Sequence, residues 1–176
     1  MAKIRVSGRP SNSSTGVVVR EEDVGQASGM ICYPGVSSCI SVTCLSGHGL
    51  SGTHLTVSTE PALVDNAMQY LKGYTAGGAS ALYIVGKLTE FRMKSKDARL
   101  KTAKTTALLL QGALNYRGKI RYYDTTGVGD AHIYAVKSGF GVDFFWQGER
   151  KGMVNGYEMP DIIDYTMIRA NDLMVQ

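Results

Sequence analysis

Short runs of β-branched and aromatic residues recur along the chain and set the main limit on its fold. Runs of this length and composition are typical of β-strands. Only two other stretches show helical periodicity, so strands dominate. We therefore expect an α+β fold in which mixed β-sheets form a sandwich-like core with two main flanking helices. The predicted strands are GVVV (16–19), SCISVTCL (38–45), THLTV (53–57), ALYIV (81–85), IRYY (120–123), AHIYAV (131–136) and VDFFW (142–146).

The two predicted helices carry apolar residues at helical spacing. In the first, apolar side chains at 64–71 recur at i, i+3, i+4 and i+7, after the capping residues Ser58 and Thr59 and before Gly73. In the second, an apolar stripe runs over 100–114 with polar residues on the other faces. Both stripes predict helices that pack one face against the sheet.

The organisation of the whole chain indicates one catalytic domain over residues 1–176. With 44% hydrophobic residues the chain can build a substantial core, and it shows no internal repeat or convincing linker. No apolar run approaches the ~20 residues of a membrane helix, and the N-terminus lacks the apolar stretch of a secretory signal. Three cysteines leave at least one free thiol, which favours a reducing compartment.

Positive charge is concentrated between residues 92 and 121. This segment contains nine basic residues and one acidic residue, Asp97, so its net charge is +8. Such asymmetry can steer an acidic protein or a nucleic acid toward a surface. Lys101 and Lys104 lie off the apolar stripe of the second helix, so we expect them to project as candidate substrate-binding residues. A non-enzymatic module that binds nucleic acid or an acidic protein through this basic surface is one candidate function.

The segment from 38 to 57 places thiols and an imidazole on a predicted hairpin. Along the first strand Cys39 alternates onto the polar face, whereas Cys44 falls on the apolar face that points to the core. A two-residue turn at Ser46-Gly47 would set Cys39 directly opposite His54, with Cβ atoms about 4.5–5.5 Å apart. A thiol and an imidazole at that distance can act as a nucleophile and its base.

Other registers of this hairpin remain open, because its glycines permit a longer loop. A loop centred on Gly49 would set His54 opposite Cys44. We prefer Cys39, because a cysteine in an apolar alternation usually behaves as a small hydrophobic residue. Cys39 also follows the turn-like segment 34–38, whose N–H groups could converge near the sulfur as an oxyanion hole. A hairpin with no catalytic role is the structural alternative.

The spacing of Cys32, Cys39, Cys44, His48 and His54 also resembles a zinc-ligand cluster. However, Cys39 and Cys44 are five positions apart and would lie on opposite faces of one strand. Neither has a partner at the Cys-x2-4-Cys spacing of structural zinc sites. The sequence therefore predicts no metal site.

At Ser37-Ser38-Cys39, followed by His54, the chain resembles the cysteine-dependent protein-glutamine deamidases, which include CheD, the cytotoxic necrotizing factor catalytic domain and the Burkholderia lethal factor. In that family a Gly/Ser-rich turn ends in the nucleophile, and a strand, a turn and a second strand bearing the His follow. The Cys-to-His interval of 15 is similar to the necrotizing-factor branch, whereas the later order of helices and strands is similar to CheD. Ser38 stands where Gly is common, and Tyr33 stands where relatives often place a backbone carbonyl or a Thr that orients the His. The carbonyl role would survive this change, whereas a role for the Thr hydroxyl would not.

The resemblance implies a protein-glutamine deamidase in which Cys39 and His54 form a thiolate–imidazolium pair. Cys39 would attack the carboxamide carbon of a protein glutamine, and His54 would protonate the departing ammonia. His54 would then activate the water that hydrolyses the thioester. Tyr33 would orient the imidazole, and Ser37 and Ser38 would contact the substrate.

The implied reaction requires no metal and no organic cofactor. The expected partner is a protein substrate that bears the target glutamine, with an acidic surface as a candidate feature. A membrane partner is not expected, and a nucleic acid is the less favoured partner. Two settings fit the resemblance: a toxin-like secreted effector that acts in a host cytosol, or a chemotaxis-type receptor deamidase in the bacterial cytoplasm.

Overall fold

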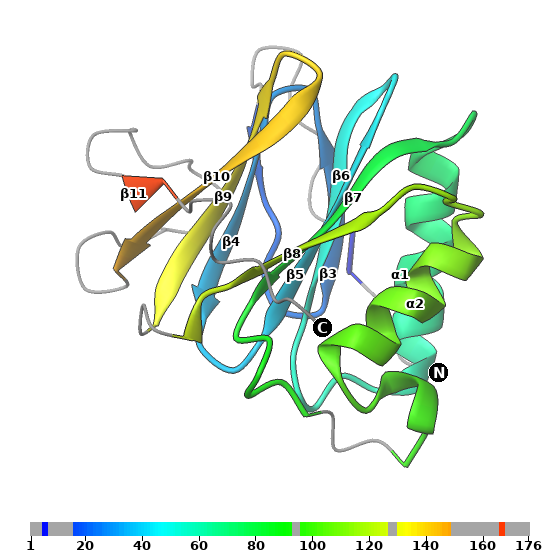
Figure 1. Cartoon of the computed structure of the whole chain (residues 1–176), viewed down its shortest axis with the longest axis vertical. Coiled ribbons are helices and arrows are strands. Elements are labelled where there is room, and N and C mark those ends of the chain that lie inside the picture. The colour runs from blue at the N-terminus through cyan, green and yellow to red at the C-terminus, as the bar shows by residue number, and fades with distance from the viewer. Residues whose placement is uncertain (1–4, 7–15, 93–95, 127–129, 149–165, 168–176) are drawn as a thin grey trace.

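The computed structural model describes residues 5–6, 16–92, 96–126, 130–148 and 166–167, which form two packed β-sheets with helices on one side (Figure 1). This arrangement confirms the predicted α+β sandwich with two main flanking helices. The strands are β1 (Arg5–Val6), β2 (Gly16–Val18), β3 (Asp23–Ala27), β4 (Met30–Val36), β5 (Ile40–Ser46), β6 (Gly49–Leu55), β7 (Ala79–Gly86), β8 (Ile120–Asp124), β9 (Ala131–Ser138), β10 (Gly141–Gly148) and β11 (Thr166–Met167). The helices are α1 (Pro61–Tyr74), a short 3-10 helix η1 (Ala98–Leu100) and α2 (Ala103–Ala113).

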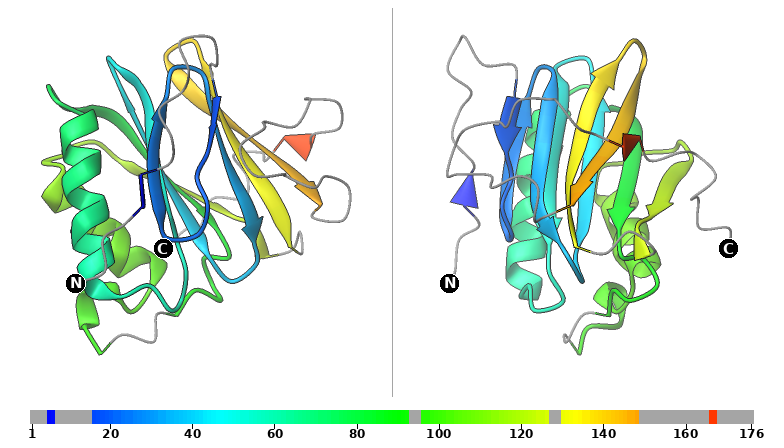
Figure 2. Two further views of the ribbon diagram at one scale, coloured as in Figure 1. Left: turned by 180° about the vertical axis from the view of Figure 1, so that it is seen from behind. Right: turned by 90° about the vertical axis from the view of Figure 1, so that its left-hand side faces the viewer.

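The two sheets have different strand orders and both mix parallel with antiparallel pairs. One sheet has six strands in the order β1-β3-β6-β5-β7-β8, and the other has five in the order β11-β10-β9-β4-β2. The parallel pairs β1–β3, β7–β8 and β2–β4 account for the mixed character. Both helices lie on the outer face of the six-stranded sheet, so the layers run helix, sheet, sheet (Figure 2).

Both helices begin with local signals that the sequence carries. Pro61 occupies the first turn of α1 after the N-cap Glu60, so the cap lies one residue beyond the predicted capping residues Ser58 and Thr59. α2 starts with a capping box in which Thr102 and Thr105 satisfy each other's backbone N–H groups. Among the described residues, no helix has the length and apolar character that crossing a bilayer requires.

Two apolar layers hold the sandwich together, and β5 contributes to both. Ile40, Val42 and Cys44 face the helices in the first layer, which confirms Cys44 on the apolar face. Cys39 and Leu45 face the second layer, between the two sheets. Every residue of β5 is buried. The polar face predicted for Cys39 is therefore an interior face too, since the second sheet covers it.

The strands β3 and β4 were not among those predicted from the sequence. The segment 34–38 was expected to be turn-like, but β4 continues through Pro34 and Gly35 to Val36. The register of β4 against β9 shifts between Tyr33 and Val36, and Gly35 has a φ of 63°. These are the features of a β-bulge, which accommodates a proline inside a strand because one residue there stays out of the ladder.

Candidate functional site

The β5–β6 hairpin turns at Gly47-His48, so Ser46 pairs with Gly49 and Ser41 pairs with His54. The predicted register, with Cys39 directly opposite His54, is therefore wrong by two residues. Because side chains alternate with a period of two, this shift keeps Cys39 and His54 on the same face of the sheet. His54 lies diagonally across from Cys39 and away from Cys44, which rules out the alternative register.

Three side chains meet at the open end of this hairpin. The Cys39 sulfur, a His54 ring nitrogen and a Glu21 carboxylate oxygen all lie within 4.8 Å of one another. The Cys39 thiol donates to Glu21 Oε1 at a distance of 3.6 Å. Cys39 is 2% exposed and His54 is fully buried, whereas Glu21 is exposed. The structure thus brings the predicted Cys–His pair together and adds a carboxylate on the solvent side.

Glu21 reaches this cluster through a tight turn between the two sheets. Asp23 N–H donates to the Arg20 carbonyl at 3.0 Å, and Glu22 N–H donates to the His54 carbonyl at 2.8 Å. Glu22 has a φ of 62°, a left-handed conformation that is uncommon for a residue other than glycine. Sequence reasoning missed Glu21 because no glycine marks this turn and the residue lies within a run of charged residues.

The backbone around Cys39 is held by β7. Lys87 N–H donates to the Cys39 carbonyl at 3.2 Å. Gly86 has a φ of 150°, and a Cβ at this position would lie 2.4 Å from the Cys39 carbonyl oxygen. Ser37 and Ser38 form the bend before Cys39, and their backbone groups contact its sulfur and favour the thiolate. Of the amides in the predicted oxyanion hole, those of Ser37 and Ser38 lie beside the sulfur.

The Gly35 amide, which the predicted oxyanion hole included, has another partner. Its N–H donates to His132 Nδ1 at 3.0 Å. His132 lies on β9 and is buried, so the bond joins the bulge of β4 to its neighbouring strand. This N–H points at an imidazole and is not available to a substrate.

Tyr33, the predicted third catalytic residue, lies between the sheets beside His54. Its ring meets the His54 imidazole edge to face, with centroids 6.2 Å apart at an angle of 87°. The hydroxyl donates to the Val42 carbonyl at 3.0 Å and lies 2.8 Å from Thr43 Oγ1. Tyr33 therefore restricts the imidazole by packing, and its hydroxyl is engaged with β5.

Burial favours the neutral forms of Cys39 and His54. It raises the pKa of the Cys39 thiol to about 11, and the negative charge of Glu21 adds to the effect. Burial also lowers the pKa of His54 to about 4, although the Val19 backbone opposes this. Both shifts oppose the predicted thiolate–imidazolium pair and favour a thiol beside a neutral imidazole.

The depressed pKa of His54 predicts an acid-sensitive fold. An unfolded imidazole, with a pKa of 6.5, takes up a proton before the buried one, with a pKa of about 4. The free energy of unfolding should therefore be undiminished above about pH 6.5 and fall by up to about 3 kcal/mol as the pH approaches 4. Urea denaturation across this range measures it, as the difference between the wild type and His54→Gln.

A matched control separates this effect from general acid destabilisation. His48 lies exposed in the hairpin turn, so a His48→Gln variant should keep the whole loss of stability seen in the wild type. If His54→Gln loses as much stability as the wild type between pH 6.5 and 4, burial of a neutral imidazole is not the cause.

The described basic residues of the stretch 92–121 lie at two different ends of α2 and do not form one surface. β7 ends beside Cys39 at Gly86. The short helix η1 and the start of α2 lie at the same end of the sheet as the β4–β5 connection (Figure 1). Lys101 directly follows η1, and Lys104 belongs to the first turn of α2. Both lysines are exposed. Arg117 and Lys119 follow the far end of α2, beside the start of β8, and Arg121 lies over the Tyr83 ring at 5.6 Å.

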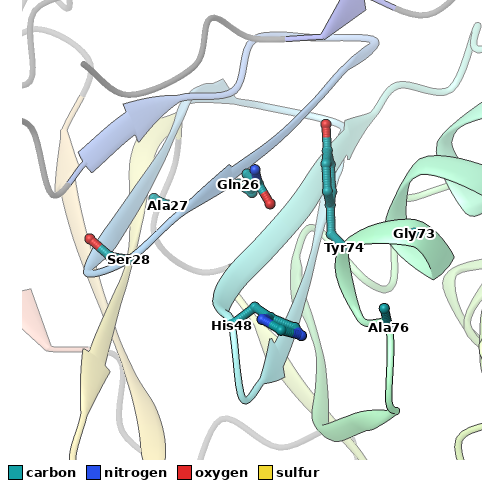
Figure 3. A pocket seen from close by; sticks show the side chains of 7 residues that line it. All are labelled: Gln26, Ala27, Ser28, His48, Gly73, Tyr74 and Ala76. Carbon is teal, nitrogen blue, oxygen red and sulfur yellow. The ribbon is translucent and has the colours of Figure 1, made fainter. Parts of the chain in front are cut away.

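A separate pocket of about 480 Å³ lies at the turn end of the hairpin (Figure 3). His48 lines it together with the β3–β4 turn and the end of α1, where Tyr74 stands at its edge. The seven residues of β5 separate it from Cys39, a distance of roughly 20 Å along an extended strand. This pocket therefore does not serve the Cys39 cluster.

No protein-family model matches the chain, and no curated protein matches it at a significant level. The resemblance to glutamine deamidases stays a prediction that rests on the segment from Ser37 to His54.

Proposed function

We propose that this protein is a cysteine-dependent protein-glutamine deamidase. One observation carries the proposal: a thiol, an imidazole and a carboxylate within 4.8 Å of one another, next to the Ser37 and Ser38 amides. A nucleophile, its base and a group that stabilises the charged base are the parts that acyl transfer needs. Backbone amides beside the sulfur are suited to stabilise the oxyanion that forms on the amide carbonyl.

The neutral resting pair suits a general-base route. His54 accepts the thiol proton as Cys39 attacks the carboxamide carbon, so the thiolate exists only as the new bond forms. The Glu21 carboxylate stabilises the imidazolium, which then protonates the departing ammonia. Water deprotonated by His54 hydrolyses the thioester and restores the Cys39 thiol. The net reaction converts a glutamine carboxamide and water into a glutamate carboxylate and ammonium.

The surroundings of the cluster favour a macromolecular substrate. The sulfur lies beneath the Ser37-Ser38 bend, and Glu21 is its exposed neighbour, so an extended glutamine side chain would enter from this edge. A glutamine side chain offers little contact area, so selectivity must come from the surrounding surface of the partner. Lys101 and Lys104 lie at this end and would favour an acidic partner surface. A secreted effector and a bacterial cytoplasmic enzyme both fit this chemistry.

Mass spectrometry of proteins incubated with the full chain tests the proposal. We expect a gain of about one dalton at a glutamine, release of one ammonia for each event, and a transient acyl adduct on the peptide that contains Cys39. Substrates with acidic residues around the glutamine should react faster at low salt. Binding of polyanionic nucleic acid, with no deamidation in any protein tested, would instead favour the non-enzymatic binding module.

A further inference from the structure

The cluster at the open end of the hairpin combines the three side-chain types that zinc prefers. Thiolate sulfur, imidazole nitrogen and carboxylate oxygen bind Zn²⁺ at about 2.0–2.3 Å, and three protein ligands with one open position define a typical reactive zinc site. Cys39, His54 and Glu21 supply one ligand atom of each kind, all within 4.8 Å of one another. The set differs from the Cys/His spacing considered for the sequence, because Glu21 comes from the β2–β3 turn.

His54 provides a second and independent indication of a ligand. The imidazole is fully buried, and neither Nδ1 nor Nε2 makes a hydrogen bond of good geometry among the residues that the structure describes, although the Val19 backbone lies close enough to favour the protonated ring. Two other polar side chains in the space between the sheets are hydrogen-bonded: Ser41 donates to the Val85 carbonyl at 3.0 Å, and Tyr33 donates to the Val42 carbonyl. A buried polar group without a partner is costly, and a metal at the cluster would relieve that cost at one ring nitrogen.

The geometry requires only small movements to close around a metal ion. Tetrahedral coordination places ligand atoms about 3.3–3.6 Å apart, so atoms now within 4.8 Å need to approach by roughly 1 Å. The Glu21 side chain is exposed, and its carboxylate already accepts a hydrogen bond from the Cys39 thiol, so an ion could reach the cluster from the solvent side of Glu21. A thiolate, a carboxylate and a neutral imidazole around Zn²⁺ also sum to zero charge, which suits a site that is mostly buried.

We propose that Glu21, Cys39 and His54 bind one Zn²⁺ ion and that the bound ion reversibly blocks the nucleophile. Zn²⁺ replaces the proton that Cys39 now shares with Glu21, so a zinc–sulfur bond forms as the sulfur–hydrogen bond breaks, and one proton leaves to solvent. Water completes the fourth position. The inhibitory part rests on the proposed deamidase activity, whereas metal binding itself does not depend on it.

Titration of the full-length, metal-free protein with Co²⁺ and Zn²⁺ tests the site. We expect one Co²⁺ per chain, a thiolate-to-cobalt charge-transfer band, displacement of that band by Zn²⁺, and protection of the Cys39 peptide from maleimide. Loss of even an outer-sphere partner weakens zinc sites about 10- to 100-fold. Cys39→Ser and His54→Gln should therefore raise the dissociation constant by at least about 100-fold, and Glu21→Gln by about 10-fold.

Matched variants keep the test decisive. Cys44→Ala and His48→Gln remove the neighbouring thiol and imidazole of the same hairpin, and both should bind Co²⁺ like the wild type. Glu21→Gln changes an exposed residue and keeps the fold, so it remains informative if a buried variant fails to fold. The proposed site is contradicted if the wild type shows no charge-transfer band. It is also contradicted if the band disappears in Cys44→Ala but remains in Glu21→Gln.

The same titration separates the two proposals. If the protein binds Co²⁺ through these residues but deamidates no substrate, the metal site is supported and the proposed function is contradicted. If the protein deamidates glutamine but keeps full activity with saturating Zn²⁺, the proposed function is supported and inhibition by zinc is contradicted.

Discussion

Replacing Cys39 with serine is expected to reduce glutamine deamidation at least about 1,000-fold, because removal of one member of a nucleophile–base unit removes most of its rate acceleration. A serine hydroxyl can still donate to Glu21, so the fold should survive. His54→Gln should cause a comparable loss, and the two losses should not add in the double variant, since both residues act in one step. Initial rates of ammonia release measure the effect.

Cys44→Ala provides the matched control for this prediction. Cys44 is also fully buried on β5, but it faces the helices on the opposite side of the sheet from His54. Its removal should cost some stability through a small cavity and leave kcat/KM unchanged. Equal loss of activity in Cys39→Ser and Cys44→Ala, in step with loss of folded protein, would show that the hairpin is only structural.

Gly86→Ala is expected to destabilise the fold by about 4 kcal/mol and to displace the nucleophile. A φ of 150° is strained for alanine, and its Cβ would lie 2.4 Å from the Cys39 carbonyl oxygen and 2.9 Å from Ile40 Cα. Strain of this kind costs about 1–3 kcal/mol, and forced overlap adds about 1–3 kcal/mol. The contacts are with backbone, so relief requires that β5 and β7 separate. Urea denaturation measures the loss.

Gly112→Ala is the control for the glycine variant. Gly112 lies near the end of α2, and no atom lies within 4 Å of the position that an alanine methyl group would take there. Alanine at this position should therefore stabilise the fold by about 0.5–1 kcal/mol. A neutral result at Gly86 would mean that β5 and β7 do not approach as closely as the structure shows.

The hairpin shows how far the sequence could determine the site. The alternation of residues placed Cys39 and His54 on one face, and a shift of two residues preserved that result. The turn itself could not be chosen, because Ser46-Gly47 and Gly47-His48 both suit a two-residue connection. A distant contact decides it: Gly49 has a φ of 110°, and a Cβ there would lie 2.7 Å from the Ala27 carbonyl oxygen. Only the packing of β3 against β6 reveals this.

The protonation states of Cys39 and His54 could not be predicted from the sequence for a similar reason. A hairpin with one polar face suggested that Cys39 and His54 meet water. The second sheet covers that face, and its strand β4 was not predicted, because Pro34 and Gly35 in a strand are signals of a turn. Burial then shifted the pKa values of both groups toward their neutral forms. The α+β class and the two helices, by contrast, follow from local periodicity and were predicted.

The Tyr33 hydroxyl links the two sheets of the sandwich. Tyr33 belongs to the five-stranded sheet and bonds to the Val42 carbonyl of the six-stranded sheet, in a slot that exists because residue 52 is a glycine whose Cβ would collide with the phenol. Glu21 lies between β2 of the five-stranded sheet and β3 of the six-stranded sheet, and its backbone bridges to His54 of β6. The cluster of Glu21, Cys39 and His54 therefore lies where the chain crosses from one sheet to the other. Sliding of the two sheets by one residue, about 3.3 Å, would strain this crossover, and the hydrogen bond from Tyr33 to β5 opposes that sliding.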